Sequence, residues 1–266
     1  MIDTIKLRVE DFQIDSSCKI QVQPACFCAD TGEVIGEIEL FRKNGVPVYG
    51  KKAWVNTDRF HFDINFKGTF IRAEIPDYYS KNNYYSVSCG EFYQFPKLLE
   101  KDLREAGIHT DVERANISRL DIFKNGNMKK EPLYYFPVLR SCRGKRVNKR
   151  DYGDTILFEN TQREACFYDK YNQLADKGIN VSNVPKNTLR AEVRFLHNTV
   201  VKRFTGGITN MSELKEYYGT LKKVYEKQLT DMIFRYGTDK PEQLCLFGKD
   251  YETLSYFKEQ SERTAF

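Results

Sequence analysis

The stretch "TLRAEVRFL", residues 188–196, has the alternation of a β-strand with two unlike faces. Apolar side chains fall on one face and charged side chains on the other: Leu189, Ala191, Val193 and Phe195 against Arg190, Glu192 and Arg194. A charged face of this kind is either solvated or paired with charges on a neighbouring strand. The pattern therefore predicts a strand that covers an apolar core with one face only.

Other segments of the chain have the same strand character, with aromatic and β-branched residues between Gly, Asp and Asn. They are residues 4–9, 19–28, 33–41, 59–66, 69–75, 116–123 and 154–160. Helices are expected at about 96–106, stopped by Gly107, and around 132–139. The expected fold class is α+β, with antiparallel sheets and flanking helices.

The order of these elements suggests a domain over residues 1–208 made of two β-then-α halves, about 1–110 and 111–208. A C-terminal helical region, 209–266, follows. Its first part has a cap signal at Asn210 and Glu213 and an apolar stripe, so we expect one long amphipathic helix.

The composition is that of an ordinary globular protein, with 41% hydrophobic and 30% charged residues among 266. No apolar run approaches the roughly 18 residues of a membrane span, and the first twenty residues carry charges where a signal peptide is apolar. We therefore expect no membrane partner and a cytoplasmic location. The seven cysteines lack zinc-site spacing and are expected to be reduced packing residues.

Residues 140–150, "RSCRGKRVNKR", contain six basic side chains and no acidic one. The segment has almost no apolar residues, so we expect a mobile cationic loop. Such a loop either binds a polyanion such as a nucleic-acid backbone or is a plain surface linker. The basic residues that would contact DNA are Arg143, Lys145, Arg146, Lys149 and Arg150.

The stretch "REACFYDKYNQL", residues 163–174, places Tyr168 and Tyr171 around an Asp-Lys pair. In a strand, Tyr168 and Lys170 share a face; in a helix, the two tyrosines lie one turn apart. Asp121 and Glu192, on two strands of the same half, are hard oxygen donors suited to Mg²⁺ or Mn²⁺. A tyrosine beside such an ion, with a lysine to help displace its proton, can attack a phosphodiester.

Four segments in order carry a family resemblance: "MIDTIKLRV", "NISRLDIF", "DTILFENTQREACFYDKYNQL" and "TLRAEVRFLHNTVVKRF". Together they resemble the rolling-circle replication initiators of filamentous phages and, more loosely, those of rolling-circle plasmids. The resemblance implies a Rep/relaxase-like nickase core in residues 1–208. It also implies an endonuclease that nicks an origin through a tyrosine, stays joined to the 5′-phosphate, leaves a 3′-OH for a polymerase and later rejoins the strand.

The resemblance assigns the nucleophile to Tyr168, its partner to Lys170 and the acids to Asp121 and Glu192, with Glu159 aligning as well. Tyr171 is the reserve nucleophile, and Arg190 and Arg194 would offset charge on the phosphate. The His-hydrophobe-His pair of many tyrosine nickases is missing, since His61, His109 and His197 are far apart in sequence. The metal is therefore assigned to Asp121 and Glu192, with His197 an outside candidate or a plain helix-start histidine.

The implied partners are single-stranded or supercoiled origin DNA, a host helicase and a polymerase, in the cytoplasm of a bacterial host. Exposed aromatic residues could stack on unpaired bases, and the tyrosine-rich segment 78–85 is one candidate. Three other functions stay open. The chain could be a non-catalytic single-stranded nucleic-acid-binding protein, a metal-dependent nuclease that uses water, or a plasmid mobilisation relaxase with the same chemistry.

Overall fold

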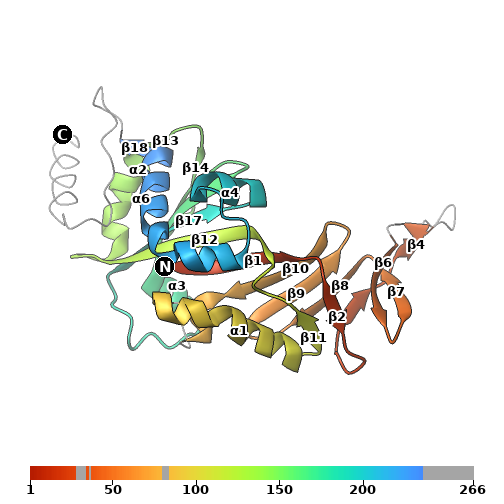
Figure 1. Ribbon diagram of the computed structural model, residues 1–266. Coiled ribbons are helices and arrows are strands. Elements are labelled where there is room, and N and C mark those ends of the chain that lie inside the picture. The colour runs from red at the N-terminus through yellow and green to blue at the C-terminus, as the bar shows by residue number, and fades with distance from the viewer. Residues whose placement is uncertain (28–33, 36, 80–83, 236–266) are drawn as a thin grey trace, which may run out of the picture.

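A ten-stranded antiparallel sheet is the frame of the computed structural model, which describes residues 1–27, 34–35, 37–79 and 84–235 (Figure 1). The central strand is β1 (Ile2–Val9), which pairs with β10 (Gly68–Glu74) on one side and β12 (Asn116–Asn127) on the other. Beyond β10 lie β9 (Phe60–Asn65), β8 (Lys52–Asn56) and β3 (Gln21–Gln23). Beyond β12 lie β17 (Thr188–Phe195), β16 (Arg163–Asp169), β15 (Thr155–Glu159) and β14 (Asn148–Asp151).

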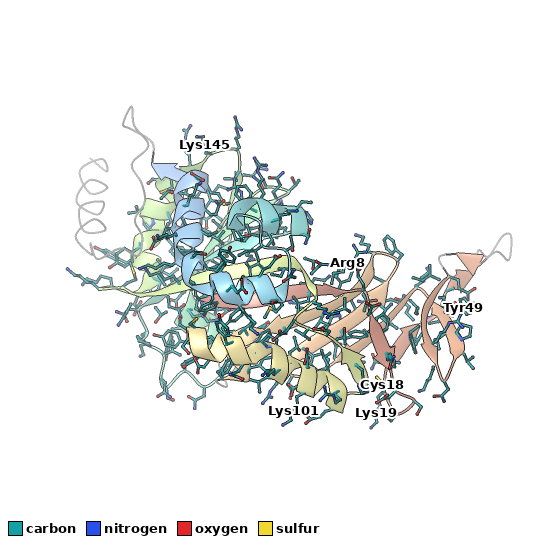
Figure 2. All side chains as sticks on the ribbon, viewed as in Figure 1. Arg8, Cys18, Lys19, Tyr49, Lys101 and Lys145 are labelled. Atoms are coloured by element: carbon teal, nitrogen blue, oxygen red, sulfur yellow. The ribbon has the colours of Figure 1, made fainter. Side chains whose placement is uncertain are left out.

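Smaller strand pairs border this sheet. They are β2 (Phe12–Ile14) with β11 (Ile108–Thr110), β4 (Cys26–Phe27) with β5 (Val34–Ile35), β6 (Ile38–Lys43) with β7 (Val46–Gly50), and β13 (Cys142–Gly144) with β18 (Ile233–Arg235). The β6–β7 hairpin and β4 project as an arm beyond β8, and Tyr49 lies on this arm (Figures 1 and 2).

Helices cover one face of the sheet and form the core with it. They are α1 (Cys89–Glu105), α4 (Asn198–Thr205), α5 (Met211–Tyr217) and α6 (Leu221–Met232). Phe92 of α1 stacks on Tyr218, and the Tyr225 hydroxyl of α6 donates to the Ala191 carbonyl of β17 over 3.1 Å. The alternating apolar residues of β17 are buried in this core. The expected α+β class with a large antiparallel sheet is confirmed.

The remaining helical elements connect the strands. They are η1 (Ile75–Tyr78), η2 (Pro132–Tyr135), α2 (Phe136–Ser141), α3 (Lys170–Asp176) and η3 (Tyr218–Thr220). Within the described part of the chain, no helix is long and apolar enough to cross a membrane. The division of residues 1–208 into two halves stays a prediction.

Helix α1 begins well before Pro96, the start expected from sequence. Ser88 accepts a hydrogen bond from the Glu91 amide, and the Glu91 carboxylate accepts one from the Ser88 amide, which completes a capping box. Phe92 and Phe95 are fully buried in the first turns, so tertiary packing holds them helical although Pro96 lacks an N–H. The helix ends before Gly107, whose φ of +79° is the left-handed stop expected there.

The single long helix expected after Asn210 is wrong, because the segment is divided into α5, η3 and α6. The cap is confirmed: Asn210 and Glu213 form a capping box. The break falls at η3, where Gly219 has the lowest helix propensity of the segment. Residues 236–266 of the expected helical region lie outside the described residues, as do residues 80–83 of the tyrosine-rich segment.

The mobile loop expected at residues 140–150 is also wrong. The segment contains the end of α2, strand β13 and strand β14. Cys142–Gly144 pairs with β18, and Asn148–Asp151 adds an edge strand to β15. These backbone hydrogen bonds order the segment although its side chains are almost all exposed. Amino-acid composition does not indicate such strand pairing, so the loop prediction failed.

Candidate functional site

The sheet face opposite the helices carries a continuous set of polar and charged side chains, here called the polar face. In β17 it receives Arg190, Glu192 and Arg194. The register places Tyr168 of β16 beside Arg190, and Glu164 beside Arg194. Both faces of β17 are therefore buried, so the charged row is paired with neighbouring strands and not simply solvated.

The Tyr168 hydroxyl donates a hydrogen bond to Oε1 of Glu192, and both side chains are buried. Oε2 of the same carboxylate accepts from Arg194, at 2.7 Å from Nη2 and 3.0 Å from Nε. Burial would raise the pKa of Glu192, but Arg194 and Arg190 hold that pKa below its ordinary value. Glu192 is therefore an anion, and it is the acceptor of the hydrogen bond that the neutral Tyr168 hydroxyl donates.

Arg190 lies at the centre of the polar face and is 0% exposed. Its Nη1 lies 2.9 Å from Oδ1 of Asp3 and 3.7 Å from Oε1 of Glu192, and its Nε donates to Oδ1 of Asn125 over 2.8 Å. The guanidinium also stacks on Phe123, 3.9 Å from the ring centroid. A buried arginine requires such complete pairing, because an unpaired buried charge is very costly.

Lys170 completes this group from the first turn of α3. It is 0% exposed, its Nζ donates to Oε1 of Gln173 over 2.9 Å, and it lies 5.8 Å from the centroid of the Tyr168 ring. Burial, together with repulsion from Arg190, lowers the pKa of Lys170 to about 7. Burial, together with the Glu192 charge, raises the pKa of Tyr168 well above its ordinary value. The phenol is therefore neutral, while the lysine titrates near neutrality.

Asp121 belongs to a second group, farther along the strands. Its two carboxylate oxygens accept from Arg119 at 2.8 and 2.9 Å, and Arg194 of the adjacent strand pairs with Glu164 at 3.1 Å. Burial raises the pKa of Asp121 although Arg119 opposes that effect. In the register, Asp121 stands opposite Arg194 and Tyr168 opposite Arg190, four residues apart on β17, or roughly 13 Å. The structure brings Tyr168 together with Glu192 and Lys170, but not with Asp121.

These two carboxylates do not fit a divalent cation as they are arranged. Mg²⁺ and Mn²⁺ need free oxygens that converge on one point at about 2.0–2.2 Å. Arg119 occupies both oxygens of Asp121, and Arg194 with Tyr168 occupies both oxygens of Glu192. No group of three or more His, Cys, Asp or Glu side chains placed to hold a metal ion occurs among the described residues. In this arrangement neither carboxylate has an oxygen free for a divalent cation.

The basic residues expected to contact DNA lie together at one end of the sheet, where Figure 2 labels Lys145. Lys149 donates to the carbonyls of Arg140 and Cys142, and Arg150 Nε lies 2.5 Å from Oε1 of Glu159. Arg143, Lys145 and Arg146 are exposed around the turn between β13 and β14. The resemblance aligned Glu159 with the site acids, but Glu159 lies with this basic group, four residues along β15 from Thr155, the residue opposite Tyr168.

The reserve candidates lie outside the Tyr168 group. Tyr171 is half-buried in α3. His197 is exposed at the start of α4, and its ring nitrogen contacts the Thr161 carbonyl at 3.1 Å, so it matches the helix-start alternative. Sequence reasoning missed Asp3 and Asn125, which bind Arg190. The signal for Asp3 was a lone carboxylate among the apolar residues at the start of β1.

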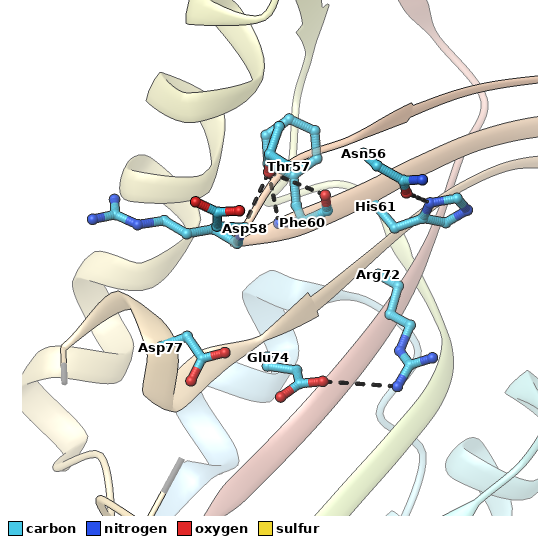
Figure 3. A pocket seen from close by; sticks show the side chains of 9 residues that line it. Asn56, Thr57, Asp58, Phe60, His61, Arg72, Glu74 and Asp77 are labelled. Carbon is cyan, nitrogen blue, oxygen red and sulfur yellow. Dashed lines mark hydrogen bonds and ion pairs between the residues drawn. The ribbon is translucent and has the colours of Figure 1, made fainter. Parts of the chain in front are cut away.

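A pocket of about 460 Å³ is lined by residues of β8, β9, β10 and η1 (Figure 3). Its lining includes His61, Arg72, Glu74 and Asp77. Burial and the neighbouring Glu74 raise the pKa of Asp77 to about 6, while Lys170 and Arg190 oppose the shift. The pocket is thus within electrostatic reach of the buried lysine and arginine.

No family model matches the chain, and no curated protein matches it in sequence.

Proposed function

We propose that this chain nicks and rejoins single-stranded DNA through a covalent 5′-phosphotyrosine on Tyr168, as a rolling-circle replication initiator does. The observation that carries the proposal is the hydrogen bond from the Tyr168 hydroxyl to the Glu192 carboxylate, beside the buried Lys170. A nucleophile bonded to a base, with the base oriented by a third group, is the common arrangement of activated nucleophiles. Arg194 is the group that orients Glu192.

In this proposal the Tyr168 oxygen attacks the phosphorus and the bond from phosphorus to the 3′ oxygen breaks. The phenol proton passes to Oε1 of Glu192 and is returned to the departing 3′ oxygen, so the products are a tyrosine phosphodiester and a free 3′-OH. The reverse reaction rejoins the strand without a nucleotide cofactor to supply energy, because one phosphate ester replaces another. The Lys170 ammonium offsets the charge that develops on the phosphate.

The raised pKa of Tyr168 makes the proton acceptor essential. A neutral phenol attacks phosphorus poorly, so its proton must leave as the new bond forms. Tyr168 is 7% exposed, and the attack requires the phosphate to reach its hydroxyl. The surroundings of this hydroxyl must therefore open when the strand binds.

The test is a denaturing gel of the purified protein incubated with single-stranded DNA that contains a candidate origin, with Mn²⁺, with Mg²⁺ or with EDTA. The proposal expects a protein–DNA adduct that Tyr168→Phe abolishes and that Tyr171→Phe, the matched control in the same segment, retains. Cleavage without an adduct in both variants would replace the proposal with a nuclease that uses water. The EDTA arm measures the dependence on a divalent cation.

A second function, a non-catalytic binder of single-stranded nucleic acid, is favoured by the completeness of the same network. Both oxygens of Glu192 are paired and the phenol is buried, as in a network that only stabilises a fold. For this function, Tyr168→Phe should leave DNA affinity unchanged, and no adduct should form under any of the three ionic conditions.

A further inference from the structure

The half of the polar face on β1, β8, β9 and β10 carries aromatic and basic side chains in cross-strand rows. One row aligns Trp54, Asp63, Phe70 and Arg8, and the next aligns Asn56, His61, Arg72, Lys6 and Arg119. Five of these residues and the adjoining Lys52 are here called the cationic patch: Lys6, Lys52, Trp54, His61, Phe70 and Arg72.

Two lysines of the cationic patch lie over its two rings, and the patch reaches solvent. Lys6 Nζ lies 4.1 Å from the centroid of the Phe70 ring, and Lys52 Nζ lies 5.7 Å from that of Trp54. Both rings are half-buried and Arg72 is exposed, while the helix α1 lies on the opposite face of the sheet. Figure 3 shows His61 and Arg72 lining the pocket at the edge of the patch.

The basic side chains of the patch repel one another, and two carboxylates lie beside them: Glu74 Oε1 is 3.9 Å from Arg72 Nη2, and Asp63 Oδ1 is 3.6 Å from His61 Nε2. Burial lowers the pKa of Lys6, and Lys52, Arg72 and Arg119 lower it further against the opposing Asp63. Burial also lowers the pKa of His61; Asp63 opposes this effect, while Lys52, Lys6 and Arg72 act in the same direction as burial. Asp63 is 6% exposed and accepts from Asn65 over 2.5 Å, so it presents little negative charge to solvent.

We propose that the cationic patch binds single-stranded DNA, with unpaired bases stacked on Trp54 and Phe70 and phosphates held by Lys6, Lys52 and Arg72. Rings flanked by cations on an open sheet favour single strands, because paired bases cannot turn their faces to the sheet. This proposal rests on the proposed function in one respect: the bound strand would extend from the cationic patch toward Tyr168. Six strand intervals separate β8 from β16, or roughly 29 Å.

Trp54 is the one tryptophan of the sequence, so its fluorescence reports directly on the patch in the unaltered protein. The probe is a 20-residue oligothymidylate, longer than the roughly 4–16 nucleotides that one single-strand-binding domain covers. We expect a saturable decrease of Trp54 fluorescence with the single strand and a much smaller one with a duplex of equal length. Binding measured by anisotropy without any change in Trp54 fluorescence would overturn the proposal.

Variants provide a second measurement. Trp54→Ala should weaken binding by roughly 5- to 150-fold, the range for loss of one base stack, and Trp54→Phe should restore most of it. Arg72→Gln should lower the slope of log affinity against log salt by about 0.7. Arg104→Gln, the same change on exposed α1, should leave the slope unaltered. Equal slopes for the two arginine variants would contradict the assignment.

The outcome separates this proposal from the nickase. Fluorescence quenching without a Tyr168 adduct would retain the patch and reject the nickase. An adduct with no contribution from Trp54 or Arg72 would retain the nickase and reject the patch. An oligouridylate that binds more tightly than the oligothymidylate would overturn the assignment to DNA.

Discussion

Replacing Glu192 by glutamine removes one negative charge from the buried network and leaves the shape of the side chain almost unchanged. Glu192 contacts Arg194 at 2.7 Å, Arg190 at 3.7 Å and the Tyr168 hydroxyl. Loss of one partner from a buried ion pair costs about 3–5 kcal/mol. Arg190 keeps Asp3, and Arg194 keeps Glu164, so we expect the lower end, about 3 kcal/mol.

The assay is equilibrium unfolding in urea at pH 7, with thermal melting as a second measurement. A loss of about 3 kcal/mol corresponds to a decrease in Tm of roughly 6–12 °C for a chain of this size. The matched control is Glu164→Gln, which removes the same charge from a side chain that is 19% exposed. There we expect less than about 1 kcal/mol, because water screens that pair.

The pH dependence gives this prediction a sign. The folded-state pKa of Glu192 lies below the ordinary value of 4.5, so its contribution to stability is complete above that pH. The contribution disappears as the pH falls through the folded-state pKa. The difference in unfolding free energy between the native protein and Glu192→Gln should therefore be constant near neutrality and shrink in acid. Equal losses for Glu192→Gln and Glu164→Gln at pH 7 would refute the reasoning.

Three further predictions concern other parts of the molecule. Because the pKa of Lys170 is lowered to about 7, its positive charge is lost as the pH rises through that value. The kcat/KM for nicking should therefore fall above pH 7 in the native protein and stay level in Lys170→Arg. An increase of kcat/KM above pH 7 in the native protein would instead make the neutral lysine a general base. The double variant Lys145→Gln/Arg146→Gly should lower the slope of log DNA affinity against log salt concentration by about 1.4. The fold should stay intact, because the φ of +57° at Arg146 suits glycine. An unchanged slope would show that this turn does not contact DNA. Gly144→Ala should lower the free energy of unfolding in urea by about 1–3 kcal/mol, because a Cβ there would lie 2.1 Å from Cγ2 of Val147. In the control Gly90→Ala, the new Cβ would have nothing within 4 Å, so the free energy of unfolding should not decrease. Equal losses in the two variants would count against the clash at Val147.

The strands could be predicted from sequence because apolar and polar side chains alternate with a period of two, and this alternation persists even where both faces of a strand are buried. In β17 it separated the core residues from the charged row, and in β12 it put Asp121 with Phe123. The helix boundaries were less readable. Helix α1 starts at a capping box seven positions before the proline that local propensity marks as a start, since Phe92 and Phe95 hold those turns against the sheet.

The composition of the site was only partly predictable. Tyr168, Lys170 and Glu192 are close in space because β16 and β17 are neighbours; the motif order brought the three residues together as candidates, but not this pairing. The partners of Arg190 were not predictable, because Asp3 comes from the first strand of the chain and reaches the site where the register of β1 on β12 shifts between Ile2 and Ile5. Register shifts of this kind depend on the whole sheet and leave no local pattern.

The position of β1 in the middle of the sheet has a consequence for synthesis on the ribosome. Strand β1 is synthesised before the strands that flank it, and the partner of Asp3, Arg190, follows 187 positions later. Until then the central strand lacks part of its charged surroundings, and closing so long a loop makes folding slow. A nascent chain that stops short of β17 would hold a buried aspartate with no guanidinium beside it, so chaperones and proteases should meet this protein mainly as an unfinished chain.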